Sequence, residues 1–291
     1  MAGPVHVEEA VPDPVEVRAL AGAAEAADGV APLSEPVLLA LHGGGGRHLL
    51  ARRDGVLVGY AQLNRDIAEL VTHPAHRRQG AGGQLLDALE QRAGTDLQVW
   101  AHGRRPAAVA FAESRGYTAE RVLWQLRRPL DGRIPDAPLP AGLTLRAFRP
   151  GRDEDAWVAV NARAFAGHRE QGAWTAADLR LREGEPWFDP DGFLLAERPD
   201  GSLAGFHWTK VHPGPPPIGE VYVLGVDPSA QGIRLGPALA TAGLRHLRDR
   251  GLAAVLLYAD EDNPQAVRLY ERLGFTKWDV DVQFGRTTRS A

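Results

Sequence analysis

The sequence contains no cysteine and a single methionine among its 291 residues. The absence of cysteine excludes disulfide bonds, thiolate zinc sites and a cysteine nucleophile in this chain. Lysine is nearly absent too, because Lys210 and Lys277 are the only two lysines among 33 basic residues. No apolar run approaches the ~18 residues that a membrane-spanning helix needs, so we expect no membrane partner.

The chain also lacks a large charge of either sign, since 33 basic and 37 acidic residues give a net charge of −4. That balance argues against generic nucleic-acid binding. Residues 1–14 carry acids and prolines where a secretory signal would have a basic and then an apolar stretch. We therefore expect a cytoplasmic protein, and 44 % hydrophobic with 24 % charged residues is typical of a folded globular chain.

What the sequence does contain is one long internal repeat. His73-Pro74 corresponds to Asp227-Pro228, and Arg77 corresponds at the same separation to Gln231. Further along, Gly116-Tyr117 corresponds to Gly274-Phe275. Two blocks that keep their order and nearly their separation indicate that one domain was duplicated in tandem. A stretch rich in proline lies between the copies, which predicts an N-terminal domain over 1–128, a linker over 129–142 and a C-terminal domain over 143–291.

Each half shows the same order of helices and strands, which predicts an α/β (α+β) fold with a mixed central sheet flanked by helices. Asp54-Gly55 and Asp200-Gly201 each separate two alternating apolar runs, a strong hairpin signal. Helices are expected at 15–28, 34–41 and 154–165; strands are expected at 47–53, 56–64, 97–101, 193–198, 202–212 and 254–258, with closing strands at 121–126 and 280–284.

A glycine-containing loop stands before a helix in the first half, with the pattern Arg77-x-x-Gly80-x-Gly82. Small residues let the backbone approach a ligand, and the free N–H groups of a first helical turn attract an anion such as a diphosphate. On this element alone, ordinary turn chemistry is the more frequent explanation of such glycines. The spacing matches neither a Walker loop nor a dinucleotide-binding fingerprint.

A loop of the form Arg/Gln-x-x-Gly-x-Gly follows a strand and a proline. Together with the pattern Asn263-Pro264-x-Ala266-x-x-Leu269-Tyr270-x-x-x-Gly274-Phe275 downstream in the second half, it resembles the GNAT acetyltransferase superfamily. The tandem arrangement and the stretches 205–213 and 219–228 resemble, more closely, the mycothiol synthase family of actinobacteria. That resemblance extends from about Val15 to Phe284. It implies a small-molecule amine substrate, because this family acetylates the cysteine amine of a Cys–glucosamine–inositol pseudodisaccharide with acetyl-CoA.

The resemblance implies an acetyl-CoA contact set in each half. In the first half it comprises Leu70, Val71, Thr72, Arg78, Gln79, Gly80, Ala81, Gly82 and Gly83. In the second half it comprises Leu224, Gly225, Val226, Gln231, Gly232, Ile233, Arg234, Leu235, Gly236, Pro237, Asn263, Pro264, Gln265, Ala266, Val267 and Arg268. Arg234 stands where the family normally has glycine, so we expect the first half to bind acetyl-CoA at least as tightly as the second.

The resemblance also makes Glu220 the general base and Tyr270 the general acid. Comparing the halves by sequence matches Glu220 with Asp66 and Tyr270 with Ala112. We therefore expect the C-terminal domain to be catalytic and the N-terminal domain to bind acetyl-CoA without catalysing transfer. The resemblance further implies that substrate is contacted by Glu35, Glu170, Lys210, Glu220 and Tyr258.

Two alternatives remain open at this point. The chain could be a tandem GNAT enzyme for another amine, such as an aminoglycoside or a polyamine, or an acyl-CoA sensor without turnover. We expect no metal site, since the pairs His73/His76 and His207/His212 give no complete ligand set. With two domains already paired, we expect a monomer.

Overall fold

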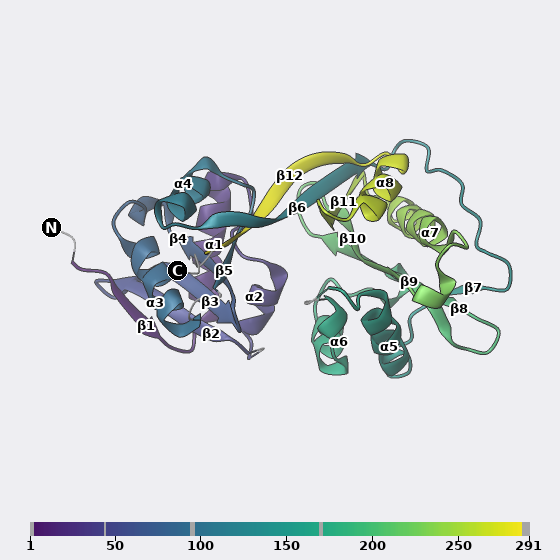
Figure 1. The fold of residues 1–291 in the computed structure, drawn as a ribbon, viewed down its shortest axis with the longest axis horizontal. Coiled ribbons are helices and arrows are strands. Elements are labelled where there is room, and N and C mark those ends of the chain that lie inside the picture. The colour runs from purple at the N-terminus through teal and green to yellow at the C-terminus, as the bar shows by residue number, and fades with distance from the viewer. Residues whose placement is uncertain (1–2, 44, 94–96, 169–170, 287–291) are drawn as a thin grey trace, which may run out of the picture. The chain divides into compact units, whose positions relative to one another are not determined.

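The computed structural model describes residues 3–43, 45–93, 97–168 and 171–286 and shows two compact units (Figure 1). Unit 1 comprises residues 1–123 and 279–291, and unit 2 comprises residues 124–278. Among the described residues, no helix is long and apolar enough to cross a membrane. The predicted substrate residue Glu170 lies outside the described residues.

Unit 1 is built on a mixed sheet with strand order β1-β2-β3-β4-β5, followed by the second half of β12. Strands β4 and β5 are parallel, and the other pairs are antiparallel. Its elements are β1 (His6–Glu9), α1 (Pro14–Asp28), α2 (Glu35–Ala40), β2 (Arg47–Arg53), β3 (Val56–Asn64), β4 (Ile67–Thr72), η1 (Pro74–His76), α3 (Ala81–Ala93), β5 (Gln98–Ala101), α4 (Pro106–Ser114) and the start of β6 (Thr118–Pro129).

Unit 2 repeats this plan with strand order β6-β11-β10-β9-β8-β7. Strands β10 and β11 are parallel, which corresponds to β4 and β5 of unit 1. Its elements are β7 (Thr144–Ala147), α5 (Glu154–Ala164), η3 (Gln171–Ala173), α6 (Ala176–Glu183), η4 (Pro190–Gly192), β8 (Phe193–Glu197), β9 (Leu203–His212), β10 (Ile218–Val226), η5 (Pro228–Ala230), α7 (Leu235–Asp249), β11 (Ala254–Asp260), α8 (Pro264–Arg272) and the start of β12 (Thr276–Gly285).

Local signals in the sequence account for most of these elements. Asp13 caps α1 by accepting a hydrogen bond from the Val15 amide, Pro14 opens the helix, and Gly29 ends it in the left-handed conformation. Asp54 and Gly55 both adopt positive φ between β2 and β3, as a tight hairpin turn requires.

Alternate residues of each strand point to opposite sides of the sheet, and helices pack on both sides. In unit 1, Leu49 packs in the core under α3 and its neighbour Leu50 packs in the core under α1. In unit 2, Trp208 belongs to an aromatic core with Trp157 of α5. Val255 belongs instead to the core under α7 and α8.

The unit boundaries differ from the predicted domains 1–128 and 143–291. Strand β12 pairs with β5 from Val282↔Ala101 to Gly285↔Gln98, so the last strand of the chain completes unit 1. From Trp124 onward β6 belongs to unit 2, next to β11, and the predicted linker 129–142 lies within unit 2 as well. The two closing strands are therefore exchanged between the halves of the chain.

Candidate functional site

A strand, a loop and a helix form the predicted anion-binding element in unit 1. His73 accepts a hydrogen bond from the Ala75 amide at the end of β4, and Gly80 takes a φ of 93° just before α3. The Arg77 guanidinium is paired with Asp28 at 2.6 and 2.8 Å, which holds the C-terminal end of α1 beside the loop. The first turn of α3 thus presents backbone N–H groups beside a loop that this ion pair holds in place.

A cavity of about 520 Å³ opens beside this loop in unit 1. It lies where β4 and β5 part, because these strands pair only from Ile67↔Gln98 to Glu69↔Trp100. The cavity is lined by seven of the residues predicted to contact acetyl-CoA in this half: Leu70, Val71, Thr72, Arg78, Gly80, Gly82 and Gly83. The other two are placed elsewhere, since Gln79 accepts a hydrogen bond from Arg53 and Ala81 is buried.

The corresponding loop of unit 2 follows β10. Asp227 caps η5 by accepting a hydrogen bond from the Ser229 amide, and its carboxylate is also paired with Arg163 at 2.6 Å. Strands β10 and β11 pair only at Gly219↔Val255 and Glu220↔Leu256, so they part immediately after Glu220. This parting resembles the one that opens the cavity of unit 1.

Helix α8 of unit 2 begins with the predicted Asn263-Pro264 pair. Asn263 caps the helix by accepting a hydrogen bond from the Ala266 amide. Residues 263–268 of the predicted contact set therefore form the cap and first turns of one helix, as 224–226 form the end of β10. The remaining predicted contacts, 231–237, form the loop and the first turn of α7.

Arg234 occupies a backbone conformation that suits glycine. Its φ of 65° and ψ of 26° lie in the left-handed region, and the matching position in unit 1 is Gly80. Arg234 lines a small pocket together with Ile233 and residues 137–140 of the predicted linker. An L-residue in this conformation costs roughly 1–2 kcal/mol.

We expect Arg234→Gly to raise the free energy of unfolding by about 0.5–1 kcal/mol, because relief of this strain exceeds the extra backbone entropy of glycine in the unfolded chain. Denaturant unfolding followed by tryptophan fluorescence measures the change. Arg78→Gly is the matched control, since Arg78 has a φ of 60° in the loop of unit 1. A destabilised Arg234→Gly protein would contradict this account of the loop.

The predicted base Glu220 is buried on β10, with 6 % of its surface exposed. It lies directly across from Lys210 on β9, and its Oε2 is 2.7 Å from Nε2 of His212. The Lys210 ammonium lies 4.4 Å from the ring centre of Trp187 and 5.2 Å from that of Tyr222, which gives it cation–π contacts on this face.

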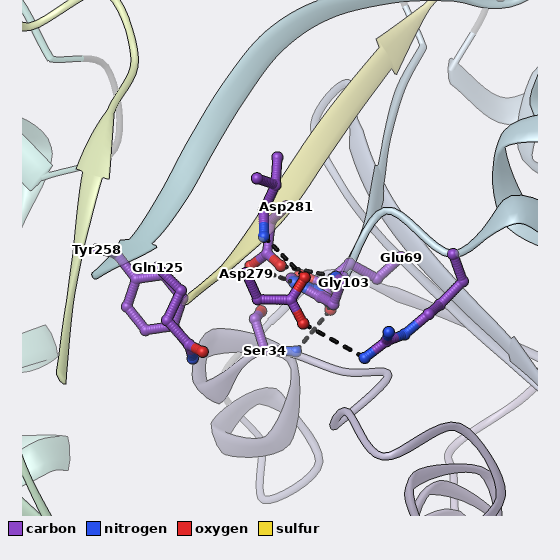
Figure 2. Close-up of polar contacts among 10 residues, drawn as sticks. Ser34, Glu69, Gly103, Gln125, Tyr258, Asp279 and Asp281 are labelled. Atoms are coloured by element: carbon purple, nitrogen blue, oxygen red, sulfur yellow. Dashed lines mark hydrogen bonds and ion pairs between the residues drawn. The ribbon is translucent and has the colours of Figure 1, made fainter. Parts of the chain in front are cut away.

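The structure brings three of the predicted substrate residues to one face of the unit 2 sheet. Lys210 and Glu220 are cross-strand partners, and Tyr258 lies two residues beyond Leu256, the partner of Glu220 on β11. Tyr258 is 43 % exposed, and its hydroxyl accepts a hydrogen bond from Gln125 at 3.0 Å (Figure 2). Glu35 belongs to unit 1, where it is the first residue of α2.

The predicted acid Tyr270 comes from the other face of this sheet. It lies in α8, packs with Phe275 at a ring separation of 5.5 Å, and shares a core with Val255 and Leu257. Burial raises the pKa of the Tyr270 phenol above its usual range, which keeps it protonated at neutral pH. Glu220 and Tyr270 therefore lie on opposite faces of the sheet. Beyond Glu220, β10 and β11 are no longer paired, so no strand pairing separates the two faces at that point.

The strand register corrects one match between the halves. A β-bulge between Val221 and Val223 adds one residue to β10, whereas β4 pairs with β3 without interruption. Leu224↔His207 corresponds to Leu70↔Ala61, so Lys210 corresponds to Asn64, whose partner is Ile67. Ile67, and not Asp66, therefore stands in unit 1 where Glu220 stands in unit 2.

Sequence reasoning missed a buried charge cluster in unit 1. The His102 ring lies between two carboxylates, with Nδ1 2.9 Å from Asp281 and Nε2 3.3 Å from Glu69. Figure 2 shows Glu69 and Asp281 converging with Gly103 and Ser34, whose amides donate to Asp281 and Glu69 respectively. Asp281 comes from the last strand of the chain, so no local sequence signal could have found the cluster.

Burial by itself lowers the pKa of His102, but the charges and hydrogen bonds of Glu69 and Asp281 outweigh it and raise the pKa to about 10. The ring is therefore an imidazolium at neutral pH. It also lines the 520 Å³ cavity, close to Trp100 and Arg105. The sequence missed the contact between His212 and Glu220 as well, although strand alternation places both on one face.

The comparisons with known proteins agree with this geometry. The family model described as "Acetyltransferase (GNAT) family" matches residues 21–117 and 158–275. A protein named mycothiol acetyltransferase from Thermomonospora curvata is 58 % identical and aligns over 92 % of each chain. One of the same name from Salinispora arenicola is 56 % identical over 95 % of this chain and 94 % of its own.

Solved structures show the same fold. A GCN5-related N-acetyltransferase from Sphaerobacter thermophilus has a TM-score of 0.67 at 27 % identity, covering 97 % of this chain and 96 % of its own. A tandem GNAT protein from the clavulanic acid biosynthesis pathway has a TM-score of 0.71 at 19 % identity, covering 97 % and 98 %. The predicted fold class, two GNAT domains in tandem, is confirmed.

Proposed function

We propose that this chain, which belongs to the acetyltransferase (GNAT) family, moves an acetyl group from acetyl-CoA to the cysteine amine of a Cys–glucosamine–inositol pseudodisaccharide, giving mycothiol and CoA. The relatives that are more than half identical carry the name mycothiol acetyltransferase. The observation that carries the proposal is the common face of Lys210, Glu220 and Tyr258, which offers charged and hydroxyl groups to a hydroxyl-rich amine.

Acetyl-CoA is the acetyl donor in this proposal, with one binding region in each unit. Support comes from the parted strands, the glycine-containing loops and the helix N-termini that both units share. The cavity of unit 1 is large enough for the narrow pantetheine arm, and Trp100 and His102 are among its lining residues. The measurement that distinguishes one site from two is calorimetric titration of the whole chain.

Unit 2 is the catalytic unit in this proposal. Unit 1 has Ile67 in place of the base and Ala112 in place of the tyrosine, so it holds neither group that transfers a proton. The β-bulge is also confined to β10 when the two corresponding strand pairs are compared. Bulges re-aim neighbouring side chains, and this one lies directly beside Glu220.

In the reaction, Glu220 takes a proton from the substrate ammonium, directly or through one water, and leaves the free amine. An α-amino group has an ordinary pKa of ~7.7–8.0, so a tenth or more is already free near neutral pH. The amine nitrogen then attacks the thioester carbonyl, and a backbone N–H near Val226 stabilises the oxyanion. The C–S bond then breaks as the attacking nitrogen releases its second proton to water, and no covalent intermediate forms on the protein.

Tyr270 then protonates the departing thiolate. A thiol has an ordinary pKa of ~8.5 and a phenol one of ~10, so the transfer is uphill in water. Burial raises the pKa of the Tyr270 phenol further, because it penalises the phenolate. The proton ends on the sulfur of CoA, and the phenolate regains a proton from water.

We expect the pseudodisaccharide to be acetylated with kcat/KM at least 10²-fold above aminoglycosides and polyamines, since a site built for polar groups rejects ligands that leave them unpaired. Loss of thioester absorbance measures turnover without interference from the substrate's own thiol. Faster turnover of another amine would make this a different tandem acetyltransferase, and tight CoA binding without turnover of any amine would make it an acyl-CoA sensor.

We expect Tyr270→Phe to lower kcat by about 10²-fold on the same substrate.

A further inference from the structure

In the part of the chain that the structure describes, His212 is the one polar side chain within hydrogen-bond distance of the Glu220 carboxylate. Its Nε2 lies 2.7 Å from Oε2 of Glu220. The side chain of Glu220 is 8 % exposed, whereas that of His212 is 37 % exposed. A carboxylate buried to this degree needs hydrogen-bond partners, and the histidine at the strand end supplies one.

The position of His212 follows from the register of β9 and β10. Glu220 pairs with Lys210, and Ile218 pairs with His212, so His212 and Glu220 are diagonal neighbours on one face. Glu220 is also the last residue of β10 paired with β11, and the bulge begins at the next residue. The carboxylate thus stands at a break in the ladder, where backbone pairing alone fixes it poorly.

We infer that His212 is a positioning residue that orients the Glu220 carboxylate, an inference that rests on the proposed role of Glu220. By holding Oε2, the imidazole leaves Oε1 as the oxygen that faces the amine. A base that is fixed in this way does not have to be ordered in the transition state. The imidazole itself touches neither the amine nor the thioester.

The test compares His212→Leu, which removes the donor, with His212→Gln, whose amide nitrogen has nearly the reach of Nε2. We expect His212→Leu to lower kcat by about 10- to 100-fold with the KM for acetyl-CoA unchanged. We expect His212→Gln to keep kcat within about threefold of wild type, because its amide donates to the same carboxylate oxygen. His6→Leu, an exposed strand histidine of unit 1, is the matched control.

A double variant separates this inference from the proposed function. If His212 acts through Glu220, Glu220→Gln/His212→Leu is no slower than Glu220→Gln alone. Unchanged kcat in His212→Leu, or equal losses in the Leu and Gln variants with a folded protein in both, overturns the inference. Unchanged kcat in Glu220→Gln alone overturns the proposed base instead, and thermal unfolding verifies that each variant is folded.

Discussion

Glu220→Gln is expected to lower kcat for acetyl transfer by about 10²- to 10⁴-fold, the largest effect on activity that the site implies. Glutamine keeps the shape of the side chain and a hydrogen-bonding partner for His212, but it cannot take a proton from the amine. Acetyl-CoA binding is expected to stay unchanged, because Glu220 lies before the loop and not on it. Steady-state kinetics by thioester absorbance and calorimetry of acetyl-CoA binding measure the two quantities.

The matched control for this substitution is Asp66→Asn in unit 1. Asp66 aligns with Glu220 by sequence, but the register places Ile67 at the corresponding strand position. We therefore expect Asp66→Asn to leave kcat within about twofold of wild type, as for a substitution away from the site. A loss in Asp66→Asn comparable to that in Glu220→Gln would show that unit 1 takes part in the transfer.

The largest effect on stability is expected from His102→Leu in unit 1. The substitution leaves the buried carboxylates of Glu69 and Asp281 without their shared cation. Breaking a buried ionic group in this way costs about 3–5 kcal/mol. Urea unfolding measures the loss, with Trp100 beside His102 as a fluorescent reporter in the same unit.

A charge-free variant tests whether the effect is ionic. We expect His102→Leu combined with Glu69→Gln and Asp281→Asn to regain most of the lost stability, because replacing a whole buried ionic group is often nearly neutral. A triple variant as unstable as His102→Leu would mean that packing of the ring, rather than charge, stabilises this part of unit 1.

The raised pKa of His102 sets the direction of the pH dependence. Its folded-state pKa of about 10 exceeds the ordinary histidine value of ~6.5, so the stabilisation is fully present below pH ~6.5 and is lost as the pH rises toward 10. Wild type should lose unfolding free energy between pH 7 and 10, and the charge-free variant should lose less. An NMR titration in which the His102 ring deprotonates near pH 6.5 would contradict this.

Much of the fold could be predicted because its signals are local. The Asp-Gly hairpin turns, the Asp13 and Asn263 caps, and the loop before each long helix each depend on a few neighbouring residues. The tandem duplication is likewise visible as a repeated pattern. Recognising the acetyltransferase pattern needed only the loop and one later helix with the Gly274-Phe275 pair that follows it.

The register of the site could not be predicted in the same way. A bulge adds one residue without changing the apolar pattern, so counting along the chain pairs Glu220 with Asp66, and only the ladder reveals Ile67. The positioning contact from His212 and the cluster around His102 depend on residues that come together only when strands pair.

The sequence by itself determined that this chain holds two copies of one acetyltransferase domain, and that only the second copy carries both Glu220 and Tyr270. Tertiary structure decided which closing strand completes which copy. The two closing strands, β6 with 12 residues and β12 with 10, carry no local signal that assigns either of them to one sheet. The choice is made by packing, because Val282 and Phe284 fill the core of unit 1 while Leu126 and Leu130 fill the core of unit 2.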